Sequence, residues 1–173
     1  MVRKMNELFE EITPIRTSDQ RVRVFISSTI EELKEEQNAA INAVHDLKLH
    51  PIFFEEGARP NNPRDVYKSY LEQSKIYIGI FWKQYGLIPP NGTISGIEDE
   101  YNLSEKLLRL IYVKEAPEGR DPRLEALLQR IRDDADISYC RFGNYIELID
   151  KVKNDIMQLL SESLGIESHG RLK

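Results

Sequence analysis

Residues 76–81 read Ile-Tyr-Ile-Gly-Ile-Phe, an apolar run in the middle of the chain. A run of this kind indicates a strand that helices cover on both faces, as in the centre of a parallel sheet. Further strands are expected at residues 22–26, 51–54, 110–113 and 137–142. Apolar residues at helical spacing separate each strand from the next. Five alternations of strand and helix predict a three-layer α/β/α domain with a five-stranded parallel sheet.

The order of the strands decides where a ligand could bind. We expect the order 2-1-3-4-5 of flavodoxin-like folds, in which the chain reverses direction between strands one and three. Ligands of such sheets bind at this switch point, beyond the carboxyl ends of the strands. Polar and aromatic side chains of three segments should therefore meet there.

The first segment is Ser27-Ser28-Thr29, which ends strand one. We expect a helix to begin directly after it, since Ser28 with Glu31 and Thr29 with Glu32 both fit a capping box. The free N–H groups of such a helix start, together with the hydroxyls, favour an anion such as phosphate. The alternative is that these hydroxyls only cap the helix.

The second segment follows strand three and contains Phe81, Trp82 and Tyr85, whose aromatic faces suit a base or a nicotinamide-like ring. These rings could instead only pack the long loop at 82–95. The third segment opens a helix expected at 96–106 and contributes Ser95, Glu98 and Glu100. Acidic residues also simply favour a helix N-terminus, which is the simpler explanation for the two glutamates.

Composition narrows the classes of function. The chain has 173 residues, a net charge of -5 and one cysteine. An acidic chain without a basic face argues against nucleic acid as a partner, and the absence of a long apolar run argues against a membrane span. A single cysteine fits a cytoplasmic protein. Cys140 is expected in the core, and His45, His50 and His169 lack metal-ligand spacing, so no metal site is expected.

The chain divides into three parts by pattern. Residues 1–20 form an appendage that could hold one short amphipathic helix, residues 21–164 form the α/β domain, and residues 165–173 form a tail or linker. The sequence contains neither a phosphate-binding G-x-x-x-x-G-K-[ST] motif nor a G-x-G-x-x-G fingerprint. It is therefore neither a P-loop ATPase nor a conventional Rossmann oxidoreductase.

Several stretches resemble a known family in order and spacing. They are Val24-Phe25-Ile26-Ser27-Ser28-Thr29, then residues 31–36, 74–80 and 85–86, and finally Ser95-Gly96-Ile97-Glu98-Asp99-Glu100-Tyr101. Over about residues 22–114 the chain resembles domain-of-unknown-function family 4062. That resemblance implies a TIR-like fold related to nucleoside deoxyribosyltransferases. It also implies a place beside NACHT-type or other STAND ATPases, in bacterial defence or eukaryotic signalling.

The resemblance also implies site residues. The related enzymes use a glutamate at the start of the helix after strand three, followed by a small residue four positions on. Glu100 with Ser104 fits this spacing and Glu98 is the second choice. Ser104 replaces the usual Ala, and Leu108-Arg109 replaces a Lys-Pro pair that often precedes strand four.

Three functions follow from the resemblance. The first is cleavage of the N-glycosidic bond of NAD, with NAD as substrate and no cofactor, and with Glu100 at the ribose. The second is a non-catalytic module that binds a nucleotide or a second copy of itself. The third is hydrolysis or base exchange on nucleoside monophosphates.

Overall fold

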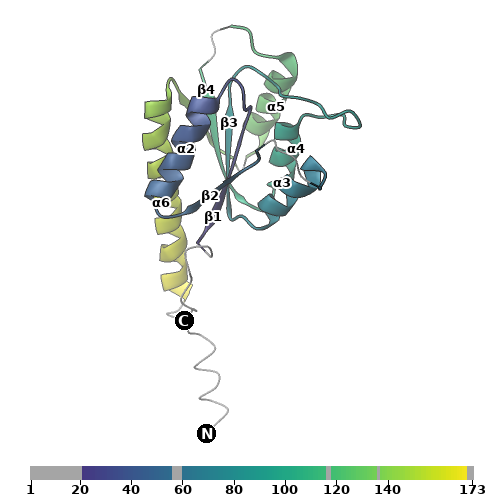
Figure 1. Ribbon diagram of the computed structural model, residues 1–173. Coiled ribbons are helices and arrows are strands. Elements are labelled where there is room, and N and C mark those ends of the chain that lie inside the picture. Colours follow the sequence, from purple (N-terminus) through teal and green to yellow (C-terminus); the bar gives the residue numbers. More distant parts are fainter. Residues whose placement is uncertain (1–20, 56–59, 116–117, 136, 171–173) are drawn as a thin grey trace.

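The computed structural model describes residues 21–55, 60–115, 118–135 and 137–170, with side chains through Leu164. The amphipathic helix predicted within residues 1–20 lies outside this part of the chain. Within it, five strands form one parallel sheet in the order β2-β1-β3-β4-β5. The predicted fold class and strand order are therefore confirmed (Figure 1).

The strands alternate with helices as predicted. The sheet consists of β1 (Arg23–Ser28), β2 (His50–Phe53), β3 (Ile76–Phe81), β4 (Leu108–Lys114) and β5 (Tyr139–Phe142). The helices are α2 (Lys34–Asp46), α3 (Pro63–Glu72), α4 (Gly96–Leu103), α5 (Pro122–Asp133) and α6 (Tyr145–Gly170). Helix α6 thus continues into the segment that was predicted as a tail or linker.

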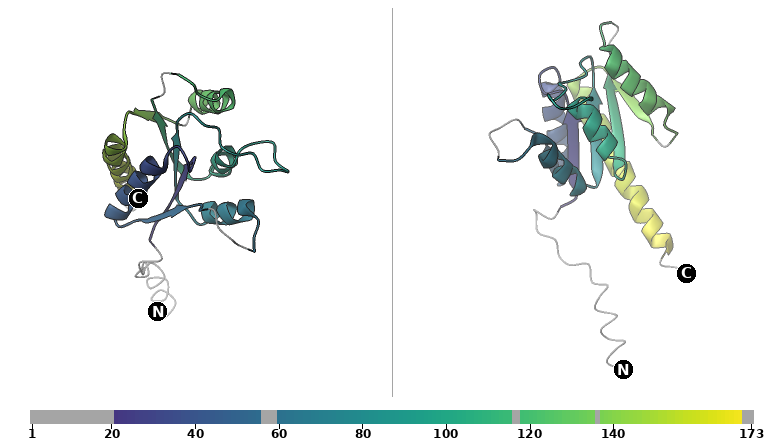
Figure 2. Two further views of the ribbon diagram at one scale, coloured as in Figure 1. Left: turned by 45° about the horizontal axis from the view of Figure 1, so that its top comes forward. Right: turned by 90° about the vertical axis from the view of Figure 1, so that its right-hand side faces the viewer.

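Helices cover both faces of the sheet, which explains the apolar run at its centre. Figures 1 and 2 show α2 and α6 on one face and α3, α4 and α5 on the other. All six residues of β3 are buried. Alternate residues of the strands face opposite layers, so Ile76, Ile78 and Ile80 join the α2/α6 core, while Tyr77 and Phe81 join the α3/α4/α5 core.

Two expectations about local structure were wrong at the end of β1. The strand does not stop before Ser27, because Ser27 and Ser28 pair with Gly79 and Ile80 of β3. Helix α2 does not begin there either. It starts at Lys34, and its N-cap residue Leu33 has no side-chain cap. The reason is that Glu32 bonds across to the loop after β3, as described below, instead of continuing a helix.

Helix α4 ends three residues earlier than the predicted 106. The Ser104 hydroxyl donates to the Tyr101 carbonyl at 2.7 Å, and the Ser104 N–H bonds to the Glu100 and Tyr101 carbonyls. This tight end turns the chain into β4. It also fixes the short helix that carries the predicted glutamates against the sheet.

Candidate active site at the carboxyl ends of β1 and β3

Ser27 and Glu100 meet in the interior of the protein. The Ser27 Oγ donates to Glu100 Oε2 at 2.5 Å, and the two residues are 73 positions apart in the chain. Ser27 is 1% exposed and Glu100 is 7% exposed. Since Ser27 lies at the carboxyl end of β1 and Glu100 in the second turn of α4, the sheet edge and the helix hold the pair together. The predicted glutamate therefore lies at the predicted end of the sheet.

Two residues of β3 that were not predicted as site residues lie next to this pair. Gly79 is the strand partner of Ser27. A Cβ on Gly79 would lie 2.8 Å from Phe81 Cε2 and 3.0 Å from Tyr77 Cε1, so only glycine lets both rings pack here. The buried Tyr77 hydroxyl has no hydrogen-bond partner, and burial, followed by the nearby Glu100, raises its pKa. A tyrosine and a glycine alternating inside an apolar strand were the available signal.

The environment of Glu100 favours its protonated form. Burial penalises the carboxylate and raises the pKa of Glu100 to about 8, and the negative charge of Asp99 adds to this effect. The hydrogen bond from Ser27 acts in the opposite direction but is outweighed. At neutral pH the side chain is therefore mostly a neutral acid in this unliganded structure.

Glu98 is held differently from Glu100. Its carboxylate accepts a hydrogen bond from the Tyr85 hydroxyl and forms an ion pair with Arg130 at 3.0 Å. The Glu98 N–H donates to the Ser95 Oγ at 3.4 Å, so Ser95 is the N-cap of α4. Glu98, Tyr85 and Ser95 thus form one network that fixes the start of α4.

Asp99 points away from both glutamates. It accepts hydrogen bonds from the Arg64 guanidinium at 2.7 and 3.2 Å and from the Tyr67 hydroxyl at 2.6 Å. These contacts tie α4 to α3. Three consecutive acidic residues therefore have three different sets of partners, and the partners Arg64, Tyr67 and Arg130 could not be selected from the sequence.

The two other aromatic candidates have separate environments. Phe81 is 1% exposed and belongs to the core under α4 and α5. Trp82 packs against the core on the α2/α6 side and donates from Nε1 to the Glu115 carbonyl at 3.1 Å. The ammonium groups of Lys83 and Lys114 lie 4.7 and 4.3 Å from the centre of its ring. A ligand ring would have to replace one of these cations to stack on Trp82.

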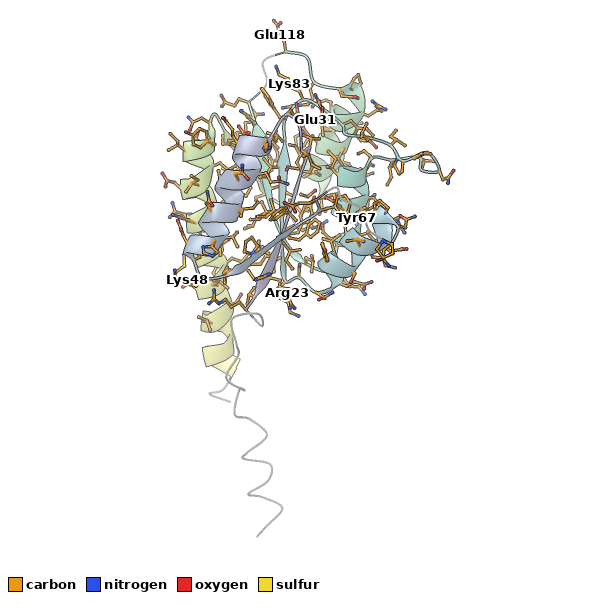
Figure 3. The ribbon with its side chains drawn as sticks, viewed as in Figure 1. Arg23, Glu31, Lys48, Tyr67, Lys83 and Glu118 are labelled. Carbon is orange, nitrogen blue, oxygen red and sulfur yellow. The ribbon has the colours of Figure 1, made fainter. Side chains whose placement is uncertain are left out.

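The expected anion site beside β1 already contains a carboxylate. Glu32 Oε1 accepts hydrogen bonds from the Thr29 hydroxyl at 3.0 Å and from the backbone N–H groups of Lys83 and Gln84 at 3.2 and 2.8 Å. Ser28 Oγ is buried and has no hydrogen-bond partner. Figure 3 shows Glu31 and Lys83 at this end of the sheet and Arg23 at the opposite end. The predicted helix start is absent here, since α2 begins at Lys34, and Glu32 already occupies the N–H groups of Lys83 and Gln84 that a phosphate would need.

No group of three His, Cys, Asp or Glu side chains that could hold a metal occurs among the described residues. No helix in the same part of the chain is long and apolar enough to cross a membrane. Cys140 lies in β5 as a free, partly buried thiol.

Comparison with known proteins identifies the family. The sequence profile of "Domain of unknown function (DUF4062)" matches residues 23–157. The chain belongs to this family. The match includes β1, β3 and α4, and therefore every predicted site residue of the DUF4062 domain. The match extends C-terminally beyond residues 22–114, over which the sequence resembles this family.

Among curated relatives of the DUF4062 domain is telomerase protein component 1. The mouse protein (Mus musculus) is 31% identical over 85 residues, and the rat protein (Rattus norvegicus) is 29% identical over 85 residues. In each case the match covers 40% of this chain and 3% of the relative. The DUF4062 chain thus corresponds to a small part of those proteins.

Solved structures share the fold at low sequence identity. The TIR domains of the activated Roq1 resistosome superpose with a TM-score of 0.54 at 14% identity, covering 78% of this chain and 99% of theirs. The CMP N-glycosidase BcmB of Clostridium botulinum gives a TM-score of 0.50 at 12% identity, covering 75% and 96%. The flavodiiron core of Flv1 from Synechocystis gives 0.52 at 13%, covering 94% and 40%. The DUF4062 domain therefore has a TIR-like fold that is also found in an N-glycosidase.

Proposed function

We propose that this domain cleaves the N-glycosidic bond of NAD and releases nicotinamide. The observation that carries the proposal is the buried Ser27–Glu100 pair at the carboxyl ends of β1 and β3. A carboxyl group with a raised pKa at the switch point of an α/β sheet is a typical feature of an active site. The TIR-like fold, which an N-glycosidase shares, supports cleavage of an N-glycosidic bond.

The chemistry requires one carboxylate at the ribose. Loss of nicotinamide leaves an oxocarbenium-like centre, which a carboxylate stabilises either as a nucleophile or through its charge. Nicotinamide leaves as a neutral molecule from a cationic ring, so its departure needs no general acid. Glu100 would supply the carboxylate, and Ser27 would hold it in position.

Glu100 must lose its proton to act in this way. Because the pKa of Glu100 is raised to about 8 in the free protein, the active form becomes the major one only above that pH. The positive charge of the substrate ring would lower this pKa once NAD is bound. We therefore expect kcat/KM for NAD, which reports the free enzyme, to rise with pH and level off above about 8.

Access to Glu100 is the second requirement. Glu100 is 7% exposed, and neither of the two cavities described for the chain, beside β5 and beside the C-terminal end of α4, includes it. The ribose can reach it only after part of the covering structure moves. Self-association that displaces the segment between β3 and α4 would provide such a movement, so we propose activity in the assembled state.

Binding of the rest of NAD would use the neighbouring residues. Ser28, with its unpartnered buried hydroxyl, and Thr29 would face the phosphates, and Trp82 or Tyr85 would face a ring. The Glu32 carboxylate must then release the N–H groups of Lys83 and Gln84. The same rearrangement would free both the anion site and the loop that follows β3.

The test is nicotinamide release from NAD, followed by chromatography at low and high protein concentration and with a crowding agent. We expect turnover that rises steeply with concentration and is lost in Glu100→Gln. Glu35→Gln, which makes the same substitution at an exposed position on α2, is the control and should keep full turnover. Wild-type turnover in Glu100→Gln would exclude Glu100 as the catalytic group.

A nucleotide N-glycosidase is the second candidate, favoured by the likeness to a CMP N-glycosidase. A neutral base leaves more easily when it is protonated, and the neutral acid form of Glu100 could donate that proton. In that case kcat/KM with nucleoside monophosphates should fall as pH rises through about 8, the reverse of the profile for NAD. Analysis of the released base separates the two activities.

A non-catalytic module is the third candidate. It would bind a nucleotide or a second copy of itself in the cytoplasm and pass a signal to an attached STAND ATPase, as in defence or innate-immune signalling. It is favoured if Glu100→Gln retains the biological effect while changes in the loop at 82–95 abolish it. The exposed Leu87 on this loop, 83% accessible, is the natural position for such a change.

A further inference from the structure

A cavity lies between α5 and β5, away from Glu100. The cavity has a volume of about 400 Å³ and is lined at its base by Val113, Leu128 and Ile131. A volume of this size is typical of sites for small ligands. Figure 2 shows α5 lying beside β5 at one edge of the sheet. The cavity is thus built from elements that the candidate active site does not use.

Cations dominate the polar lining of this cavity. Lys114, Arg120, Arg132 and Arg141 line it, against the single carboxylate of Glu115. The whole chain has a net charge of -5, so this concentration of positive charge is a local feature. Such a cluster attracts anions.

Some of these cations already form ion pairs within the chain, whereas others have N–H groups that are available to a ligand. Glu125 pairs with Arg120 at 3.0 Å and also with Arg132, and Glu36 pairs with Lys114 at 2.5 Å. Within the part of the chain that the structure describes, no carboxylate forms an ion pair with the exposed Arg141. The Nε–H of Arg132 is buried and has no hydrogen-bond partner. A buried donor without an acceptor is rare and unfavourable, so this position calls for an acceptor from outside the chain.

The Tyr139 hydroxyl marks where such an acceptor would lie. The nearby guanidinium groups of Arg141 and, to a smaller extent, Arg132 lower the pKa of Tyr139. The phenol oxygen beside these two guanidinium groups is a weak hydrogen-bond acceptor, whereas an oxyanion in the same position would be a strong one. Arg132 and Arg141 both line the cavity together with Tyr139, so an anion in the cavity could contact both guanidinium groups.

We propose that this cavity binds a small organic phosphate, with the phosphate between Arg132 and Arg141 and its apolar part against Val113, Leu128 and Ile131. A phosphate monoester carries more negative charge than a carboxylate and has three terminal oxygens, so it can form more charge-assisted hydrogen bonds with two guanidinium groups. The apolar base of the cavity selects an ester over the inorganic ion. The site is separate from NAD cleavage and does not depend on it.

The test is calorimetric titration of the whole chain with phenyl phosphate, inorganic phosphate and phenylacetate. We expect saturable binding that is tightest for phenyl phosphate. Equal affinity for phenylacetate would overturn the phosphate assignment, and equal affinity for inorganic phosphate would overturn the role of the apolar base.

Two substitutions test whether phenyl phosphate binds in this cavity. Arg141→Gln should weaken phenyl phosphate binding at least tenfold, because one charge-assisted partner is lost. Arg21→Gln removes the same charge from an exposed residue just before β1, at the opposite end of the sheet, and should leave the affinity unchanged. A second measurement follows the Tyr139 phenol by ultraviolet absorbance: bound phosphate should raise its pKa. Unchanged affinity in Arg141→Gln, in a variant that melts like the wild-type protein, would overturn the proposal.

Discussion

Glu100→Gln should change how the stability of this domain depends on pH. In the folded protein burial raises the pKa of Glu100 to about 8, whereas the ordinary value for the exposed side chain is 4.5. Between these values the folded state keeps a proton that the unfolded chain has released. The contribution of Glu100 to the free energy of unfolding is therefore fully present below pH 4.5 and is lost as the pH rises through about 8.

The size of this effect follows from the interval between the two pKa values of Glu100, 4.5 in the unfolded chain and about 8 in the folded protein. Each pH unit across it lowers the free energy of unfolding by about 1.4 kcal/mol, which gives about 5 kcal/mol in total. Glutamine has no proton to lose, so the variant lacks this contribution. Any constant difference from new hydrogen bonds of the amide, for example to Tyr77, shifts the whole curve without changing its slope.

The measurement is urea unfolding of the wild-type and Glu100→Gln proteins across pH 4.5 to about 8. The difference between the two should grow in favour of the variant as the pH rises. Ser27→Ala should extend the window to higher pH, since the Ser27 hydrogen bond lowers the pKa of Glu100. Glu35→Gln controls for the change in net charge. Parallel curves for wild-type and Glu100→Gln proteins would show that Glu100 is ionised in the fold and would refute the reasoning.

Three further substitutions, with Gly96→Ala as a control for the first, test local packing by thermal or urea unfolding. Gly79→Ala places a Cβ 2.8 Å from a core ring and should cost about 2 kcal/mol; Gly96→Ala, which meets nothing within 4 Å, should be neutral or slightly stabilising, and equal losses would contradict this account. Glu36→Ala leaves the Lys114 ammonium, whose side chain is 19% exposed, without its carboxylate partner and should lower the free energy of unfolding by about 3 kcal/mol. If this loss disappears in high salt, the pair is a surface interaction. Gly86→Ala forces a side chain into a φ of 83° and should cost about 1 kcal/mol, so an unchanged midpoint would mean that this turn relaxes freely.

The architecture was predictable because it depends on patterns that are local in the sequence. The apolar run at 76–81 could only be a strand covered on both faces, and the alternation of strands and helices required a parallel sheet. The start of α2 was not predictable in the same way. Thr29 and Glu32 have the spacing of a capping box and do bond to each other, but Glu32 also reaches the backbone of the loop after β3. A contact over 50 residues thus overrode a local signal.

The candidate site was predictable only as a neighbourhood. Strand order brings the end of β1, the end of β3 and the start of α4 together, and this follows from the topology. Tyr77, Gly79 and Arg130 were missed because their importance lies in what they touch across the sheet or from another helix. The cavity beside β5 was missed for the same reason, since its cations come from β4, the following loop, α5 and β5.

The three acidic residues at 98–100 show what the sequence determines and what depends on the tertiary structure. The sequence by itself determined that carboxylates open a helix at the carboxyl end of a parallel sheet. Only the tertiary structure decided that Glu100 meets Ser27, that Glu98 meets Arg130 and that Asp99 binds α3. Successive helical residues point about 100° apart, so the rotation of α4 against the sheet assigns each side chain to its partner. That rotation is set by the packing of the whole core, which no local stretch of sequence encodes.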